Sequence, residues 1–218
     1  RPCIWYTEEY QRMFDQMTES VLKDKTLKEN FKNIKKIYFS RRKFGKAAAT
    51  EFGEEYIEQC FNQNGYESLG PETLTLREQI YVWNHAEAIA CMNGTIPLNV
   101  VFCKNEELKL TILNKMSIYH KNPYIYLYMR NIQAEFIDIY KEPLKGYPKS
   151  LGEGPYLIKE GKEFFDYCQR EKFEIPYTGM KLKFYDLKQE IRYYLCVIGI
   201  RNKIRRVGLY IKRKMLRR

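Results

Sequence analysis

An α/β fold, with a doubly wound and mostly parallel sheet, is the fold class that the sequence predicts. Short apolar runs alternate with amphipathic helical segments over residues 34–115, and strands that are joined through helices pair in parallel with right-handed crossovers. The 218 residues, 44% of them hydrophobic and 30% charged, suffice for one sizeable core and exclude a disordered chain. We expect helical extensions on both sides of this core.

The elements of the predicted sheet follow from residue spacing. Apolar residues at helical spacing indicate a helical lead-in over residues 8–32, and the run 36–39 has the composition of a buried strand. Thr75 followed by Glu78 is the pattern of a capping box, which begins a helix. The further expected elements are a helix at about 53–64, a strand at about 66–69, a helix at about 75–85, a strand at 87–91, a short helix at about 97–102 and a strand at 108–113.

Beyond the predicted sheet the pattern of the chain changes. Residues 123–140 are rich in aromatic residues and predicted helical, and a further helix is expected at about 159–172. Glycine and proline interrupt residues 143–155 between them. The sequence is therefore divided into a helical lead-in (1–33), a sheet-forming core (34–115), a helical and loop extension (116–184), and a carboxyl-terminal helix with a basic tail (185–218).

Two short polar clusters stand directly after two of the predicted strands. One is Ser40-Arg41-Arg42, after strand 36–39, and the other is Asn93-Gly94-Thr95, after strand 87–91. In open α/β sheets, ligands bind outside the carboxyl ends of the strands, where the backbone leaves the sheet. Guanidinium groups form paired hydrogen bonds with phosphate oxygens, and a glycine turn that opens a helix offers free backbone N–H groups. The clusters therefore predict a cradle for an anionic group such as a diphosphate.

Each candidate also has a structural interpretation. Arg-Arg-Lys triplets are common on solvated loops, and Gly94 suits an ordinary turn that needs a positive φ angle. Glu54 is a candidate for binding a sugar hydroxyl or for holding an arginine, and Gln79 for contacting a nucleotide, although the helix dipole also favours an acid at a helix start. His85 and His120 have no partner pattern for acid–base work, and we interpret both as structural.

Five pieces of sequence lie between residues 35 and 102. Their order and spacing together form a more specific sequence pattern than any one piece alone. They are KIYFSRR at 36–42, Glu54, GYE at 65–67, PETLTLREQI at 71–80 and NGTIPLNVVF at 93–102. With these pieces the segment resembles the carboxyl-terminal half of the family 61 glycosyltransferases. The resemblance implies a Rossmann-like half that binds a nucleotide sugar and faces a second such half in the GT-B arrangement.

The resemblance also implies an activity. It points to a glycosyltransferase, or its donor-binding half, that acts by direct displacement at the anomeric carbon. It implies no metal and no cofactor, a UDP-linked sugar as the substrate, and a polysaccharide or lipid-linked acceptor of the kind found in bacterial capsule assembly. The residues expected to hold the donor and its phosphates are Ser40, Arg41, Arg42, Glu54, Gln79, Asn93, Gly94 and Thr95.

Two departures from the family pattern favour a rival interpretation. Asn93-Gly94-Thr95-Ile96 stands where the family usually has a His-Gly-Ala-Gly type sequence, and asparagine carries no positive charge and transfers no proton. About 32 residues precede the sheet, too few for the second Rossmann-like half. We therefore expect that half, with the acceptor site, outside this sequence or in a partner chain, and leave the catalytic base unassigned. The rival is a non-catalytic relative that binds a nucleotide sugar or a partner glycosyltransferase.

The positive charge of the chain is concentrated at its carboxyl end. The net charge of the chain is +11. Residues 201–218 contribute +9 of this charge, because they contain nine Lys and Arg and no acid, so residues 1–200 carry only +2. Apolar residues recur at helical spacing over residues 200–215, which predicts a basic amphipathic helix for an anionic membrane surface. The alternatives are packing of these apolar residues on the domain and a nucleic-acid arm, which a nearly neutral body disfavours. A further hypothesis for the whole chain, a basic membrane-surface adaptor, rests on this tail alone. The residues expected at the membrane are Arg201, Lys203, Arg205, Arg206, Lys212 and Arg213.

The six cysteines indicate a reducing compartment. They include no C-x-x-C pair, and Cys91, Cys103 and Cys196 fall in apolar segments, so we expect reduced, buried thiols and no disulfide framework. With only two histidines, neither paired with a nearby cysteine, we expect no zinc site. Acidic residues near the start exclude a secretory signal peptide in the sequence, and no apolar run is long enough to span a bilayer. We therefore expect a cytoplasmic protein, peripheral at the inner face of the membrane.

Overall fold

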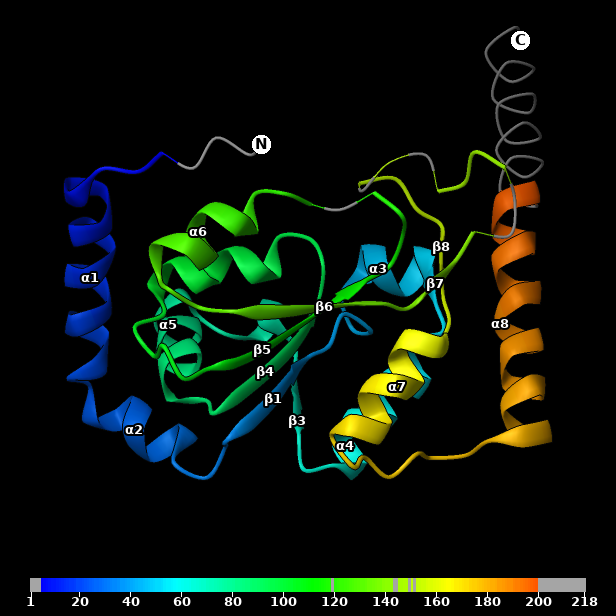
Figure 1. Cartoon of the computed structure of the whole chain (residues 1–218), viewed down its shortest axis with the longest axis horizontal. Coiled ribbons are helices and arrows are strands. Elements are labelled where there is room, and N and C mark those ends of the chain that lie inside the picture. The colour runs from blue at the N-terminus through cyan, green and yellow to red at the C-terminus, as the bar shows by residue number, and fades with distance from the viewer. Residues whose placement is uncertain (1–4, 119, 143–144, 149, 151, 200–218) are drawn as a thin grey trace, which may run out of the picture.

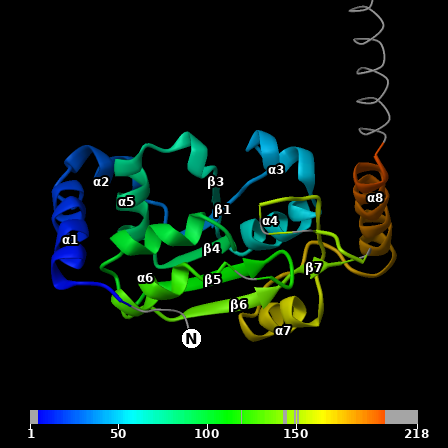
Figure 2. The same ribbon diagram turned by 90° about the horizontal axis from the view of Figure 1, so that it is seen from above.

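The computed structural model describes residues 5–118, 120–142, 145–148, 150 and 152–199. Figure 1 shows a central sheet with helices packed around it, and helices α1 and α8 at opposite ends of the molecule. Figure 2 shows the same separation from above. The basic residues expected at the membrane, all within 201–213, lie outside the described residues.

The central sheet is parallel throughout. Its strands are β1 (Lys36–Phe39), β3 (Glu67–Leu69), β4 (Ala88–Met92), β5 (Lys109–Asn114) and β6 (Ala134–Asp138), in the order β3-β1-β4-β5-β6. The chain passes from β1 to β3 and then returns to β4 on the other side of β1. The predicted doubly wound α/β fold is confirmed. The winding reverses between β1 and β4, which is the position where such sheets bind ligands.

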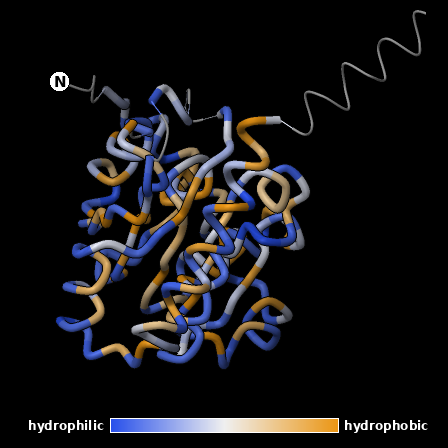
Figure 3. The backbone as a smooth tube through the Cα atoms, turned by 90° about the vertical axis from the view of Figure 1, so that its right-hand side faces the viewer, coloured by the Kyte–Doolittle hydropathy of each residue, from blue (hydrophilic) through white to orange (hydrophobic). Residues whose placement is uncertain are grey.

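Helices cover both faces of this sheet. Successive side chains of a strand point to opposite faces, and here both faces carry apolar side chains that need to be buried. Ile37 and Phe39 of β1 join one hydrophobic cluster, and Tyr38 between them joins the other. In Figure 3 hydrophobic stretches run through the middle of the molecule, while much of its outer edge is hydrophilic. The first cluster includes α1 (Glu8–Leu22), α2 (Lys25–Phe31), α5 (Leu76–His85), the 3-10 helix η2 (Ile96–Phe102) and α6 (Pro123–Met129), and the second includes α4 (Glu54–Gln63) and α7 (Lys162–Arg170).

A second, smaller sheet has three strands. β2 (Glu51–Phe52) pairs in parallel with β8 (Tyr156–Ile158), which pairs antiparallel with β7 (Tyr140–Lys141). Helix α3 (Gly45–Thr50) leads directly into β2. Helix α8 (Gly179–Ile198) packs against β2 and β8. The sequence did not predict this sheet, because strands of two or three residues show no periodicity.

Gly53 allows the close approach of β2 and β8. Its φ angle is +106°, and a Cβ at this position would lie 1.9 Å from the carbonyl oxygen of Ile158. Only glycine fits both the backbone conformation and the contact. The parallel register that results places Glu51 opposite Tyr156, and both residues belong to the candidate site.

Three predicted boundaries are wrong. The helix expected over 123–140 ends at Met129, and its second half forms β6 at the sheet edge, in the segment assigned to the helical and loop extension. Residues 134–138 form a strand because they pair with β5. The spacing of apolar residues in the sequence does not reveal such a pairing partner. The helical lead-in breaks at Asp24, whose side chain accepts hydrogen bonds from the N–H groups that open α2. The terminal helix begins at Gly179, earlier than the expected residue 185.

Two local predictions are confirmed and one is wrong. Thr75 and Glu78 form the capping box of α5, with a hydrogen bond in each direction. Cys91 and Cys103 are buried free thiols, and Cys60 and Cys168 are as well. Cys196, expected to be buried, is half-buried, because it lies between the packed and the exposed sides of α8.

Candidate functional site

A cavity of about 690 Å³ opens at the carboxyl ends of β1, β4 and β5. Arg41 follows β1, Gly94 and Thr95 follow β4, and Lys115 follows β5, so one edge of the sheet brings these four residues to the cavity wall. Glu51 and Tyr156 of the small sheet, together with Gln79 of α5, also line the cavity. Its volume is in the range of sites that bind small ligands and cofactors.

Arg41 and Lys115 share one buried carboxylate. Glu51 accepts hydrogen bonds from Arg41 Nε at 3.2 Å and from Lys115 Nζ at 2.7 Å, and its side chain is only 3% exposed. The terminal guanidinium nitrogens of Arg41 make no hydrogen bond to a described residue. Burial lowers the pKa of the Lys115 ammonium, and Glu51 opposes that shift. Because one carboxylate faces two cations, positive charge remains for an anionic ligand.

The turn after β4 offers backbone donors. The N–H groups of Gly94 and Thr95 donate no hydrogen bond to any residue that the structure describes. A Cβ at Gly94 would meet nothing within 4 Å, so open space lies beside its backbone. Gly94 is not among the described glycines with a positive φ angle. The alternative interpretation, in which the turn needs glycine for its φ angle, is therefore wrong.

Asn93 is buried beneath this turn and does not line the cavity. Its Nδ2 donates to Asn114 Oδ1 at 2.8 Å, and Asn114 Nδ2 donates to Asp138 Oδ1 at 2.8 Å. These hydrogen bonds connect the carboxyl ends of β4, β5 and β6. Asn93 therefore fixes the turn that carries Gly94 and does not itself face the cavity.

Ser40 and Arg42 also do not line this cavity. Arg42 is directed to α4, where its guanidinium pairs with Glu58 at 2.8 Å and Glu55 at 3.4 Å. Ser40 is buried, and its Oγ accepts a hydrogen bond from the Arg42 N–H at 3.3 Å. Of the two arginines predicted to face a phosphate, the structure brings only Arg41 to the cavity wall.

Glu54, at the start of α4, holds the backbone that follows β1. Its Oε1 accepts hydrogen bonds from the Arg41 N–H at 2.8 Å and from the Tyr38 hydroxyl at 3.2 Å. Burial raises the pKa of Glu54 to about 7, and the nearby carboxylates of Glu51 and Glu58 add to the shift. Of the two roles predicted for Glu54, this geometry fits the holding of an arginine, through its backbone.

We expect Glu54 to make the free energy of unfolding decrease as pH rises. Its pKa in the folded protein is about 7 against an ordinary 4.5, so the folded state binds more protons than the unfolded state between these values. The stabilisation is present below this window and is lost above it, by about 3 kcal/mol. Urea unfolding across the window should show a smaller decrease for Glu54→Gln than for wild type. Burial also raises the pKa of Glu160 to about 7, so an unchanged decrease in Glu54→Gln would assign the effect to Glu160.

The comparison with protein families agrees with this arrangement of strands and cavity. Residues 4–111 match the family model described as Glycosyltransferase 61. This chain belongs to glycosyltransferase family 61. The match includes Arg41, Glu51 and Gly94 and ends before Lys115. No curated protein matches the chain. The family resemblance seen in residues 35–102 is confirmed, and the match extends over the helical lead-in as well.

The sequence missed several cavity residues of this family 61 member. Lys115 stands two residues after the end of a predicted strand, as Arg41 does, and the argument used for Arg41 identifies it equally well. Glu51 and Tyr156 meet through two short strands that are distant in sequence, and no local signal marks either one. His120, interpreted as structural, lines the cavity, and its buried Nδ1 has no hydrogen-bond partner among the described residues.

Gln79 lies on the cavity wall, but its amide is engaged within the protein. Its Nε2 donates to the carbonyl oxygen of Pro71 at 2.9 Å, and its Oε1 accepts from Asn99 Nδ2 at 2.7 Å. Gln79 therefore connects the segment before α5 to η2. His85, at the end of α5, stacks on Tyr81 with ring centres 5.3 Å apart and does not line the cavity.

Across the described ranges, no three His, Cys, Asp or Glu side chains gather in a way that could hold a metal ion. None of the helices described here has the length and apolar character to cross a bilayer. The metal independence expected of this family 61 member stays a prediction.

Proposed function

We propose that this chain binds a nucleotide sugar, with UDP as its nucleotide, and is the donor-binding half of a glycosyltransferase. The observation that carries the proposal is the meeting in one cavity of Arg41, Lys115 and the free N–H groups of Gly94 and Thr95. Cations and backbone donors in one place suit a diphosphate better than a neutral sugar. Family membership supports glycosyltransferase activity in general, and we propose a polysaccharide or a lipid-linked glycan as the acceptor.

The proposed reaction is a direct displacement at the anomeric carbon of the sugar. The acceptor oxygen forms a bond to that carbon while the bond from the carbon to the diphosphate oxygen breaks. The electron pair of the broken bond stays on the diphosphate, and the acceptor proton passes to a base that we leave unassigned. Arg41 and Lys115 would offset the negative charge that develops on the diphosphate, as preorganised cations do in a partly desolvated site.

Other cavity residues suit the remaining parts of a nucleotide sugar. Phe44 is 40% exposed, with its ring centre 5.5 Å from the Arg41 guanidinium, and an exposed ring is a surface on which a base stacks. Glu72 and Asn99 line the same cavity and have side-chain oxygens that accept hydrogen bonds from ribose or sugar hydroxyls.

Isothermal titration with UDP, GDP, ADP and UMP tests donor binding. We expect UDP to bind at least about tenfold more tightly than UMP, because a second phosphate adds charge-assisted hydrogen bonds. Equal affinities for UDP and UMP, or no binding of any nucleotide, would contradict the proposal. EDTA should leave both binding and turnover unchanged, which tests metal independence.

Asn93 favours a second candidate function, donor binding without catalysis. The family usually has histidine at this position, whereas here Asn93 is buried, donates one hydrogen bond from Nδ2 to Asn114 Oδ1, and does not line the cavity. Turnover of a UDP-sugar, measured for this chain and for a longer chain that includes the expected second half, separates the two functions. Tight UDP binding without UDP release from the sugar in either case would establish the non-catalytic function.

Gly94→Ala should preserve folding and weaken UDP binding. The added methyl group would meet no protein atom within 4 Å, so the free energy of unfolding should change by less than about 0.5 kcal/mol. The methyl group would occupy the space in which we place a phosphate, and calorimetry should show at least about tenfold weaker binding. Gly45→Ala is the matched control, because its Cβ also meets nothing and Gly45 does not line the cavity. Equal affinities for the two variants would place the phosphate elsewhere.

Peripheral attachment to the cytoplasmic face of an anionic membrane is proposed from the sequence of residues 201–218, with their nine basic residues and no acid. No nucleic-acid partner is proposed, because residues 1–200 carry a net charge of only +2. Vesicle sedimentation should show weaker pelleting of a chain that ends at Gly199, and equal pelleting would exclude a role for the basic tail. A membrane adaptor would pellet with vesicles but would bind no UDP.

A further inference from the structure

Helix α8 exposes an apolar stripe along its whole length. At about 100° per residue, the six residues of the stripe fall within an arc of about 80° on this 20-residue helix. Each of their side chains is between 50% and 76% exposed. Single exposed apolar residues are ordinary, but a contiguous apolar patch marks contact with a partner or a membrane. The α8 stripe consists of Met180, Phe184, Leu187, Ile191, Leu195 and Ile198.

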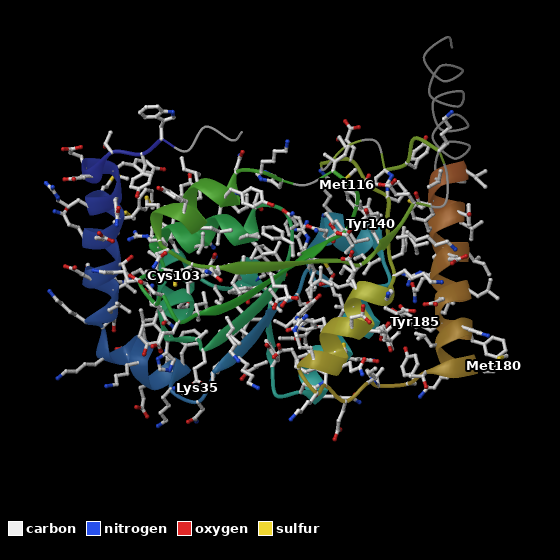
Figure 4. The ribbon with its side chains drawn as sticks, in the orientation of Figure 1. Lys35, Cys103, Met116, Tyr140, Met180 and Tyr185 are labelled. Carbon is white, nitrogen blue, oxygen red and sulfur yellow. The ribbon has the colours of Figure 1, made fainter. Side chains whose placement is uncertain are left out.

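The opposite side of α8 holds the helix on the rest of the molecule. Gln189 and Tyr193 are buried there, and the Tyr185 hydroxyl donates to the carbonyl oxygen of Gly53 at 3.0 Å. In Figure 4 the labelled Tyr185 lies on the side of α8 that faces the molecule, whereas the labelled Met180 lies on the outer side. The fold therefore already has its packing surface on α8, and the stripe is not part of it.

The exposed charges of α8 are all basic. Its two acidic residues are held toward the body of the protein, where Asp186 pairs with Lys159 at 3.0 Å and Glu190 pairs with Lys141 at 2.7 Å. By helical geometry, the basic residues flank the stripe on both sides. The exposed basic residues are Lys181, Lys183, Lys188 and Arg192.

We propose that the α8 stripe docks on the surface of an anionic lipid bilayer, with the helix parallel to the membrane plane. In this position the apolar side chains enter the boundary between headgroups and acyl chains over a length of about 30 Å. The lysine side chains on the flanks are long enough to extend outward to the phosphate layer.

Charge complementarity selects the anionic bilayer among the possible occupants. The exposed basic residues of α8 continue in sequence into residues 201–218, which hold nine basic residues and no acid. The exposed basic residues that flank the α8 stripe match the negative charge of an anionic lipid surface. A second copy of the chain would present the same positive charge to it, which disfavours self-association. The inference concerns residues 180–198 and stands independently of donor binding.

Co-sedimentation of the full chain with vesicles tests the docking surface. The vesicles are phosphatidylcholine alone, or phosphatidylcholine with phosphatidylglycerol, and every variant keeps residues 201–218. Phe184→Gln/Ile191→Gln should bind the phosphatidylglycerol vesicles at least about tenfold more weakly than wild type, because two large side chains no longer enter the bilayer. The matched control is Leu76→Gln/Ile118→Gln, since both side chains are 51% exposed but lie outside α8. This control should bind like wild type, and all variants should bind UDP equally.

A second pair of variants tests the charge. Lys181→Glu/Lys188→Glu should weaken binding to the phosphatidylglycerol vesicles more than Lys25→Glu/Lys28→Glu on α2, which changes the net charge equally. Circular dichroism checks that each variant is folded. Equal binding of the α8 variants and their controls would overturn the proposal. A wild-type dimer that the Phe184→Gln/Ile191→Gln variant dissociates, without any effect on vesicle binding, would also overturn it in favour of a second copy as the occupant.

Discussion

Arg41→Gln should weaken UDP binding by between about tenfold and a hundredfold. A hydrogen bond from a charged donor to a phosphate contributes about 1.5–3 kcal/mol, which corresponds to this range. Arg41 is well placed for such bonds because only its Nε contacts Glu51, while its terminal nitrogens bond no described residue. Its guanidinium also lies over the Phe44 ring, which limits its movement. Isothermal titration of wild type and variant with UDP measures the loss.

Arg42→Gln is the matched control for this experiment. The two variants remove the same charge from adjacent positions, so any long-range effect on an anionic ligand is equal. The Arg42 guanidinium pairs with Glu55 and Glu58 on α4 and does not line the cavity. We expect it to change UDP binding by less than about threefold, although thermal unfolding should show a small loss of stability from the lost ion pairs. Similar losses of affinity in both variants would mean that overall charge, and not the cavity, attracts the nucleotide.

Glu51→Gln should destabilise the ligand-free protein by about 3 kcal/mol, which is about 6–12 °C in Tm for a protein of this size. The side chain of Glu51 is only 3% exposed and is the shared partner of Arg41 and Lys115. Its loss leaves two neighbouring cations without a counter-charge in a largely buried place. A bound diphosphate supplies the missing negative charge, so UDP should raise the Tm of the variant more than that of wild type.

Glu72→Gln provides the comparison for this second prediction. Glu72 lines the same cavity, but its side chain is exposed and it forms no ion pair with a described residue. Its substitution should leave the Tm unchanged without UDP, and UDP should not raise the Tm of this variant more than that of wild type, because Glu72 is not the counter-charge of Arg41 or Lys115. If UDP stabilises Glu51→Gln no more than wild type, the two cations do not receive the phosphates.

The sequence predicted the core of the fold because burial on both faces leaves a pattern. The strands after Lys35, Ala86 and Glu107 are short apolar runs between amphipathic helices, and the structure has β1, β4 and β5 there. β6 was missed because the apolar residues of this segment also fit helical spacing. The segment forms a strand because it pairs with the edge of β5, which the sequence pattern does not show. The small sheet was missed because its strands are too short to show periodicity, and because Glu51 and Tyr156 meet only through long-range pairing.

The candidate site was predicted in part, and the errors have a geometric cause. A strand end identifies where the chain leaves the sheet, and this located Arg41, Gly94 and Thr95 correctly at one cavity. The same argument gives no direction for adjacent side chains, so it could not separate Arg41 from Arg42, which ion pairs with α4 hold away from the cavity. It also could not show that Asn93 bonds to Asn114 beneath the turn.

A crystal structure of this chain with UDP is the most direct test of the central claim. We predict that the diphosphate lies at the carboxyl ends of β1, β4 and β5, within hydrogen-bond distance of Arg41 and of the Gly94 and Thr95 N–H groups. We also predict that Lys115 lies close enough to a phosphate oxygen to form an ion pair. UDP bound at another position, such as the groove of about 730 Å³ lined by Gln59 and Tyr177 between α4 and α8, would contradict the claim.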